Sequence, residues 1–440
     1  EITKERTKKM TRTAQCILYR NFSEDDILMD MCALMDRAED EEWLLEHREA
    51  FYRCLNRLVE MAADYGFSGN LWCDYLTYLL VNHENAFSRG CEITGRAEGS
   101  IALLARHDFS IIRELFAADI RLFDRVYRHG DAAVIENYVP SSGDGKLFNR
   151  RIRDRICRLS QQLQRAESLE EFMDQVVGFY RDFGVGKLGL HKAFRVEPGE
   201  NGKACIVPIT NIAHVRLDDL VGYEIAKKKL TENTEAFVEG RRANNCLLFG
   251  DAGTGKSSSI KGILNQYYDR GLRIIEIYKH QFQYLNDVIA QIKNRNYKFI
   301  IYMDDLSFEE FEIEYKYLKA VIEGGLEKKP DNILIYATSN RRHLIKESFA
   351  DKEGRRDTLH SSDTVQEKLS LVSRFGVTIF FCAPNKKEFQ NIVRTLAERY
   401  GVRMEEQELL LEANKWELSH GGLSGRTAQQ FIDYLLGQQR

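Results

Sequence analysis

The sequence lacks the features that would cross-link or anchor a chain. Its nine cysteines are irregularly spaced and none forms a Cys-x-x-Cys pair, so neither a disulfide framework nor a zinc site is indicated. No apolar run reaches the ~18–20 residues that a membrane-crossing helix requires. We therefore expect reduced thiols and a cytoplasmic protein without a membrane partner.

The sequence also has no excess of charge of one sign. Charged residues make up 30% of the chain, yet the net charge is only −4, which gives no general attraction to nucleic acid or acidic lipid. The first residues, Glu1–Lys4, form no apolar signal region and include no initiator Met, so we expect a few residues upstream. The 440 residues exceed the ~250–300 at which one core stops growing, which predicts two or three domains.

Hydrophobic periodicity divides the chain into three parts. Apolar residues at three- and four-residue intervals predict an all-α N-terminal domain over residues 1–205, without a catalytic motif. Residues 206–384 alternate β-rich and helical runs, which is typical of an α/β core with a parallel sheet. Residues 385–440 are helical throughout and predict a separate lid. The expected strands are Cys246–Phe249, Leu272–Tyr278, Lys298–Met303, Asn332–Ala337 and Val377–Cys382, with helices near 256–270, 283–294, 308–325 and 363–374.

A glycine-rich motif stands between an expected strand and an expected helix. It consists of Gly250, Asp251, Ala252, Gly253, Thr254, Gly255, Lys256 and Ser257, followed by Ser258, and it has the full spacing of a phosphate-binding P-loop. Glycines let successive backbone N–H groups turn inward around an anion, and the helix N-terminus adds partial positive charge. We expect Lys256 to contact the β- and γ-phosphates of ATP, and Ser257 to hold Mg²⁺. The complete motif in this context disfavours the alternative of an ordinary loop.

Polar residues follow two further expected strands. A carboxylate at the carboxyl end of a parallel strand lies beside the P-loop crevice, so we expect Asp304 to orient Mg²⁺ through a water. Asp305 is then the expected general base toward the attacking water. Asn340, after the next strand, is placed to reach the γ-phosphate or that water. The alternatives are a polar strand end for the two acids and a turn-forming residue for the asparagine.

Two arginines that follow the P-loop in the sequence are candidates for contacts with a nucleotide. Arg374 ends an expected helix, and Arg426 begins the last expected helix after a Gly-Gly-Leu-Ser-Gly segment. Surface arginines are abundant, so each residue alone would indicate nothing. Their order after the P-loop favours a role for both at a nucleotide.

Taken in order, these motifs resemble the Walker A, Walker B, sensor 1, arginine-finger and sensor 2 elements of AAA+ ATPases, over about residues 215–440. The segments Asp304–Phe308, Ala337–Leu344 and Ser424–Ala428 are more particular. They resemble the bacterial ATPases of the domain-of-unknown-function 815 family.

The resemblance implies a P-loop NTPase sheet of five parallel strands in the order 5-1-4-3-2, covered by a helical lid. It implies that Asn340 is sensor 1 and that Arg426 is sensor 2, reaching the γ-phosphate from the lid. It makes Arg374 a finger for a neighbouring subunit's site, and hence predicts an ATP-dependent homo-oligomer. Val221 and Gly222 belong to a stretch that matches the usual lining of the adenine pocket.

The sequence departs from the AAA+ pattern at two points. The Walker B strand of most AAA+ proteins ends in Asp-Glu, whereas this strand ends in Asp304-Asp305, so the base is about one methylene shorter. Slow or partner-regulated hydrolysis would follow. In addition, Lys279–Leu285 runs almost directly into a helix, which leaves no aromatic pore loop and argues against a motor that threads polypeptides.

Three functions stay open from the sequence. The first is an ATPase that remodels or loads an unidentified protein client held by the N-terminal helices. The second is a nucleotide-gated switch with little hydrolysis. The third is a DNA-associated loader, for which the absence of a threading loop and the basic runs Arg150–Arg155 and Lys227–Lys229 are the motive, although such runs are usually solvated helix faces. A small-molecule kinase is disfavoured because no acceptor pocket is evident.

Overall fold

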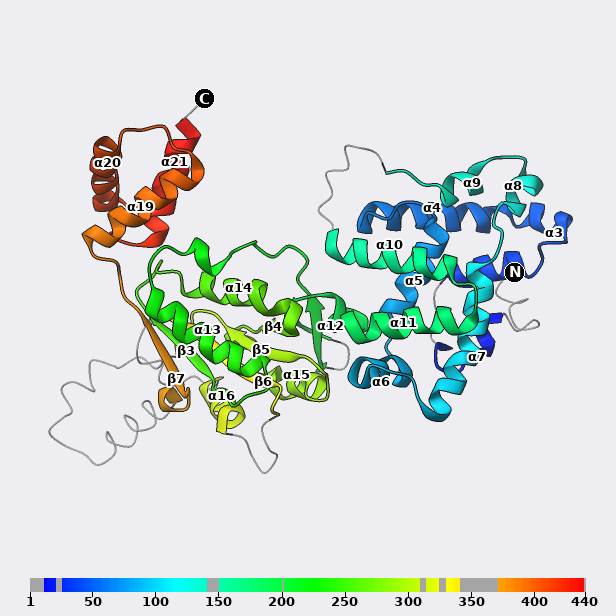
Figure 1. Ribbon diagram of the computed structural model, residues 1–440, viewed down its shortest axis with the longest axis horizontal. Coiled ribbons are helices and arrows are strands. Elements are labelled where there is room, and N and C mark those ends of the chain that lie inside the picture. Colours follow the sequence, from blue (N-terminus) through cyan, green and yellow to red (C-terminus); the bar gives the residue numbers. More distant parts are fainter. Residues whose placement is uncertain are drawn as a thin grey trace. The chain divides into compact units, whose positions relative to one another are not determined.

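The computed structural model describes residues 12–20, 26–140, 150–199, 202–308, 314–323, 330–340 and 371–438. The chain divides into two compact units, Glu1–His191 and Lys192–Arg440 (Figure 1). Within the described ranges, no helix combines the length and the apolar character that crossing a bilayer would demand. All nine cysteines are free thiols.

The first unit consists of helices around one apolar core. Its elements are η1 (Arg12–Gln15), α2 (Asp26–Met35), α3 (Glu41–Glu46), α4 (Arg48–Tyr65), α5 (Leu71–Asn82), α6 (Ala86–Thr94), α7 (Gly99–Phe116), α8 (Leu122–Tyr127), α9 (Asp131–Glu136), α10 (Arg150–Arg165), α11 (Leu169–Phe183) and α12 (Gly186–Leu190). Phe51, Phe109 and Phe172 each belong to a different stretch in which the apolar periodicity predicts a helix, and all three are buried in the core. The predicted helical character of this region is therefore confirmed.

Two buried carboxylates connect the helices of the first unit. Asp108 on α7 accepts the backbone N–H groups of residues 17–19 at 2.7–3.0 Å. Asp74 on α5 accepts a hydrogen bond from the thiol of Cys157 on α10 at 3.7 Å. Burial raises the pKa of Asp74 to about 6, although hydrogen bonds from Ser160 and Cys157 oppose the shift. The α5–α10 contact is thus sensitive to the protonation of one carboxyl.

The second unit contains a seven-stranded sheet in the order β2-β1-β4-β5-β6-β3-β7. Its strands are β1 (Ala193–Pro198), β2 (Ala204–Pro208), β3 (Cys246–Gly250), β4 (Leu272–Glu276), β5 (Lys298–Met303), β6 (Ile333–Ser339) and β7 (Val377–Phe381). β1 and β2 pair antiparallel, and the other strand pairs are parallel. β6 is buried at every residue, as expected of a central strand with both faces covered.

The sheet differs from the expectation of five parallel strands, because it has seven strands and is mixed. The difference is the β1–β2 hairpin, which pairs with the outer edge of β4. When the hairpin is left out and β3 is numbered as strand 1, the remaining five strands lie in the order 5-1-4-3-2, read from β7 to β4. The hairpin belongs to the second unit, which begins at Lys192, whereas the expected boundary followed residue 205. The physical reason is that Phe194 and Ile206 are buried as strand residues rather than as part of a helical domain.

The remaining elements of the second unit are helices. They are η4 (Leu217–Asp219), α13 (Glu224–Val238), α14 (Lys256–Tyr267), η5 (Tyr268–Arg270), η6 (Lys279–Tyr284), α15 (Leu285–Ile292), α16 (Glu314–Glu323), α19 (Lys386–Tyr400), α20 (Glu406–Ser419) and α21 (Gly425–Gln438). Apolar residues of α13 and α14 pack on one face of the sheet. The last three helices share a separate core around Phe389 and Phe431, as expected of a lid. Most of the helix expected over 363–374 lies outside the described residues.

The raised pKa of Asp74 generates a prediction for the stability of the first unit. A folded-state carboxyl with a pKa of about 6 binds its proton more tightly than the unfolded chain does, so its contribution to stability is present at low pH and lost as the pH rises through about 6. Relative to Asp74→Asn, the wild-type free energy of unfolding should fall by up to about 3 kcal/mol between about pH 4 and pH 7.

Urea unfolding followed by circular dichroism at several pH values measures this difference. Asp174→Asn, at an exposed position of α11, is the control and should run parallel to the wild type. A wild-type curve parallel to that of Asp74→Asn would contradict the prediction.

Candidate nucleotide site

The loop between β3 and α14 folds around the ammonium group of Lys256. Nζ donates to the carbonyl oxygens of Gly250, at 2.9 Å, and Asp251, at 2.6 Å. Only 6% of the Lys256 surface is exposed, and burial lowers the pKa of the amine, while nearby carboxylates oppose that effect. The structure therefore holds a buried positive charge inside the loop, where the N-terminus of α14 also favours an anion.

Two glycines let this loop approach its neighbours more closely than a Cβ would allow. Gly250 has a φ of 138°, and a Cβ there would lie 2.0 Å from the carbonyl oxygen of Phe381 on β7. Gly253 has a φ of 75°, and a Cβ there would lie 2.9 Å from Oγ of Ser424, which precedes α21. The loop thus contacts both the edge strand and the lid directly. Asp251 adds to the first contact, because its Oδ2 accepts the N–H of Ala383 at 2.7 Å.

Asp304, directly after β5, is the meeting point of three hydroxyl groups. Its Oδ1 accepts hydrogen bonds from Ser257 Oγ at 2.8 Å, Tyr302 Oη at 2.5 Å and Thr338 Oγ1 at 2.6 Å. Burial raises the pKa of the Asp304 carboxyl, but these hydrogen bonds together outweigh that effect and hold the pKa below its usual value. The site therefore presents an ionised carboxylate beside the serine hydroxyl of the P-loop.

Asp305 and Asn340 form the second polar pair of the site. Asn340 Nδ2 donates to Asp305 Oδ1 at 2.7 Å, and both residues are exposed. Asp305 has a positive φ of 48°, and its backbone N–H donates to Thr338 Oγ1 at 2.9 Å. Thr338 thus receives a hydrogen bond from one acid and donates one to the other. It thereby links the backbone of Asp305 to the carboxylate of Asp304.

The lid contacts the core on both sides of the loop. The backbone N–H of Arg426, at the start of α21, donates to the carbonyl oxygen of Gly253 at 3.1 Å. The positive charge of the Arg426 side chain is one of the influences that lower the pKa of Lys256. Arg399 of α19 donates to the carbonyl oxygen of Asp219 at 3.0 Å, next to the expected adenine segment.

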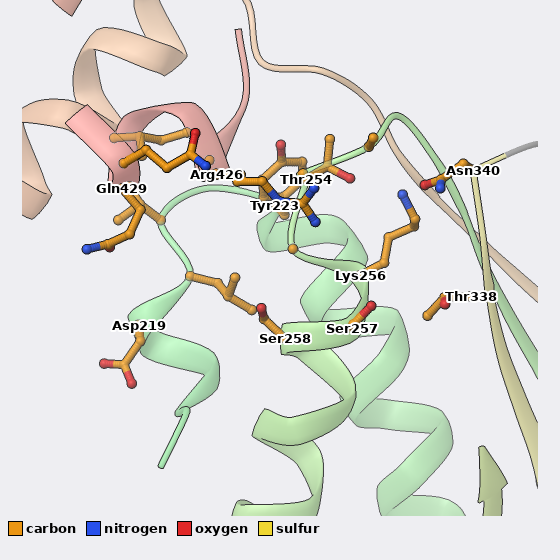
Figure 2. Close-up of a pocket in the computed structure, with 18 of the residues that line it drawn as sticks. Asp219, Tyr223, Thr254, Lys256, Ser257, Ser258, Thr338, Asn340, Arg426 and Gln429 are labelled. Atoms are coloured by element: carbon orange, nitrogen blue, oxygen red, sulfur yellow. The ribbon is translucent and has the colours of Figure 1, made fainter. Parts of the chain in front are cut away.

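These elements enclose a cavity of about 590 Å³ (Figure 2). It is lined by Asp219, Leu220, Val221, Tyr223, Ala252, Gly253, Thr254, Gly255, Lys256, Ser257, Ser258, Asp304, Asp305, Thr338, Asn340, Ile392, Leu396, Gly425, Arg426, Gln429 and Gln430. Figure 2 shows Thr338 and Asn340 at the end of a strand beside Lys256 and Ser257, with Arg426 extending from the lid toward Thr254. Apolar side chains of the 220–223 segment and α19 complete the wall, so the cavity has a charged end and a partly apolar end.

A protein-family model described as "protein of unknown function (DUF815)" matches residues 190–439. The chain belongs to this family. The match begins where the second unit begins, and it includes the β1–β2 hairpin, the P-loop and the lid. The family resemblance carried by Asp304–Phe308 and Ser424–Ala428 is therefore confirmed.

Solved structures with low sequence identity match about half of this chain. The FIGL-1 AAA domain in complex with ADP is 17% identical over 52% of this chain and 74% of its own, with a TM-score of 0.36. A point mutant of Thermotoga maritima RuvB is 18% identical, with a TM-score of 0.34, and the match covers 50% of this chain and 64% of that RuvB chain. At these TM-scores the similarities assign neither fold nor activity. Among curated proteins no match is found.

Most of the residues expected at the site line the cavity of this DUF815 member. They are Val221, Ala252, Gly253, Thr254, Gly255, Lys256, Ser257, Ser258, Asp304, Asp305, Asn340 and Arg426. Gly250 and Asp251 lie behind it as acceptors for Lys256. Gly222 lines an adjoining cavity of about 730 Å³. Arg374, half-buried after the helical residues 371–373, is not among the described residues that line either cavity.

Two site residues of the DUF815 chain escaped the sequence analysis. Tyr302 and Thr338 supply two of the three hydroxyls on Asp304, yet neither was among the expected site residues. A signal was present, because each residue lies near the end of a strand, two positions before an expected site residue that follows that strand. Alternation along a strand places such residues on the same face.

The residues of the site fit ATP and Mg²⁺ on observations of this structure. The loop places the buried ammonium group of Lys256 at the N-terminus of α14, in the wall of the cavity. A serine hydroxyl and a carboxylate meet beside it, and Mg²⁺ is usually held by one or two such oxygen ligands together with substrate phosphates. Among the described residues, no group of three or more His, Cys, Asp or Glu side chains could hold a metal alone. A metal held jointly with phosphates is consistent with this donor set.

The close approach at Gly250 predicts a large effect of one added methyl group. Gly250→Ala should destabilise the chain by at least about 2 kcal/mol more than Gly401→Ala, because a Cβ meets the Phe381 carbonyl at only one of the two positions. Gly401 also has a positive φ, 69°, but nothing lies within 4 Å, so its substitution should cost about 1–2 kcal/mol of backbone strain. Thermal unfolding of both variants measures the difference, and equal costs would contradict the prediction.

Proposed function

We propose that this chain is an ATPase that binds Mg-ATP in the cavity and converts ATP and water to ADP and phosphate. The observation that carries the proposal is the 2.8 Å hydrogen bond between Ser257 Oγ and Asp304 Oδ1 beside a complete P-loop. It brings together a hydroxyl and an ionised carboxylate at the place where the loop would hold phosphates. An ordinary turn would not require a serine hydroxyl and a carboxylate to meet at this position.

Each polar group of the site then has a role in hydrolysis. Lys256 exchanges the carbonyls of Gly250 and Asp251 for phosphate oxygens, and Arg426 adds a second positive charge from the lid. Ser257 and Asp304 hold Mg²⁺, which neutralises charge on the β- and γ-phosphates when it is bound. Asp305 and Asn340 orient the attacking water, and Asp305 accepts its proton.

A second candidate function rests on the 2.7 Å hydrogen bond between Asn340 and Asp305. Asp305 is shorter than the usual glutamate, and its carboxylate is hydrogen-bonded to Asn340. In this second candidate, the carboxylate does not reach the attacking water, and hydrolysis is slow. ATP would then act mainly as a switch that sets the state of a binding module. Single-turnover measurements decide between the two, since rapid hydrolysis by the isolated protein rules the switch out.

The oligomer and its partners follow from the same proposal. Arg374 lies outside both cavities, so its proposed role is in a neighbouring subunit's site within a homo-oligomer. An unidentified protein client of the first unit completes the proposal. A DNA partner has less support, because Lys227 donates to the carbonyl oxygen of Leu220 and Arg153 contacts Asp154.

We predict that Asp305→Asn keeps ATP affinity but lowers the turnover number by ~10²–10⁴, because the amide cannot accept the proton of the attacking water. Nucleotide titration and steady-state phosphate release measure the two quantities. Asp174→Asn, on the surface of the first unit, should behave as the wild type. A turnover number in Asp305→Asn within twofold of the wild type would exclude Asp305 as the base.

We also predict that turnover per subunit rises with protein concentration and that Arg374→Ala lowers it by ~10³ or more, because a finger acts only in an assembled site. Arg403→Ala, at an exposed lid position, is the matched control. Phosphate release measured over a range of protein concentrations tests the idea. Turnover that is independent of concentration and unaffected by Arg374→Ala would defeat it.

A further inference from the structure

Tyr302 places a hydroxyl group where packing alone would not require one. The residue lies on β5 with its ring in the apolar core under α13 and α14, and only 5% of its surface is exposed. A buried hydroxyl costs free energy unless it finds a hydrogen-bond partner. Its partner is Asp304 Oδ1, at 2.5 Å, two residues further along the chain and directly after the end of β5. A phenylalanine would fill the same core without that bond.

Thr338 reaches the same oxygen from the next strand. Its Oγ1 donates to Asp304 Oδ1 at 2.6 Å and accepts the N–H of Asp305 at 2.9 Å. With Ser257, three hydroxyls converge on one carboxylate oxygen, which has only two lone pairs to share. Oδ1 is therefore committed to the protein, and the plane of the carboxylate is fixed from β5 and β6.

We propose that Tyr302 and Thr338 are positioning residues for Mg²⁺, which fix the Asp304 carboxylate so that it can orient the ion together with Ser257. The inference rests on the proposed function, and it concerns metal affinity rather than the chemical step. Groups that orient metal ligands from behind typically contribute 10–100-fold to metal affinity or activity. Tyr302 was not among the expected site residues, and its assignment rests on its hydrogen bond to Asp304.

The sheet supplies a matched control for the Tyr302 hydroxyl. Tyr336 on β6 pairs with Tyr302 in the strand register and is fully buried in the same core. Its hydroxyl points elsewhere, to Asn233 at 2.9 Å and Thr234 at 3.0 Å on α13. Tyr302→Phe and Tyr336→Phe therefore remove the same atom from neighbouring positions, but only the first change touches Asp304.

The experiment measures binding of a fluorescent ADP analogue, first in EDTA and then during a Mg²⁺ titration. Tyr302→Phe should raise the Mg²⁺ concentration at half-saturation by about 10-fold, while metal-free affinity stays within about twofold, because the P-loop contacts are intact. Tyr336→Phe should change neither quantity. Thr338→Ser keeps the hydroxyl and should resemble the wild type, whereas Thr338→Val should show a shift at least as large as that of Tyr302→Phe.

The outcomes separate this inference from the function on which it rests. An unshifted Mg²⁺ titration in folded Tyr302→Phe, or an equal shift in Tyr336→Phe, overturns the positioning role and leaves nucleotide binding standing. A wild-type protein that binds no nucleotide overturns both. Thermal unfolding shows whether each variant is folded. If Tyr302→Phe does not fold, the contrast between Thr338→Ser and Thr338→Val decides, and equal titrations of that pair overturn the inference.

Discussion

The hydrogen bond between Ser257 and Asp304 is the contact on which the whole site depends. It joins the helix after β3 to the end of β5, two strands that are not neighbours in the sheet. The bond forms because β6 lies between them and all three strands run parallel, so that their carboxyl ends meet at one edge. β6 contributes Thr338 at that same edge. Reversal of β3 or of β5 would separate the hydroxyl from the carboxylate.

The position of the lid follows from the shape of the P-loop. Gly253 offers its carbonyl oxygen to the backbone of Arg426, and the absence of a Cβ makes room for Ser424. On the other side, Asp251 accepts the N–H of Ala383, in the segment that leads from β7 to α19. Lys256 holds the carbonyl of the same Asp251. Any group that draws Lys256 away therefore alters a residue that is tied directly to the lid connection.

The motif-bearing parts of the second unit could be predicted from the sequence because each combines a strong pattern with the correct neighbours. The P-loop lies between a strand and a helix, and residues 385–440 have helical periodicity throughout. The β1–β2 hairpin was missed because Pro198 and Gly199 are typical of a linker as well as of a hairpin turn. Two short strands at a sheet edge carry too few buried residues to produce a clear alternation. Tyr302 and Thr338 were missed for a different reason, since only the fold shows what their hydroxyls reach.

The aspartate at position 305, a departure from the usual glutamate, has a physical reason in the backbone. Asp305 has a φ of 48°, a left-handed conformation that aspartate and asparagine adopt more readily than most side chains. That turn lets the N–H of Asp305 reach Thr338 Oγ1 and the N–H of Leu306 reach the Thr338 carbonyl at 2.7 Å. A glutamate would lengthen the base, but it would also strain the turn that holds both acids against β6. The short base and the firmly held Asp304 are therefore two consequences of one backbone geometry.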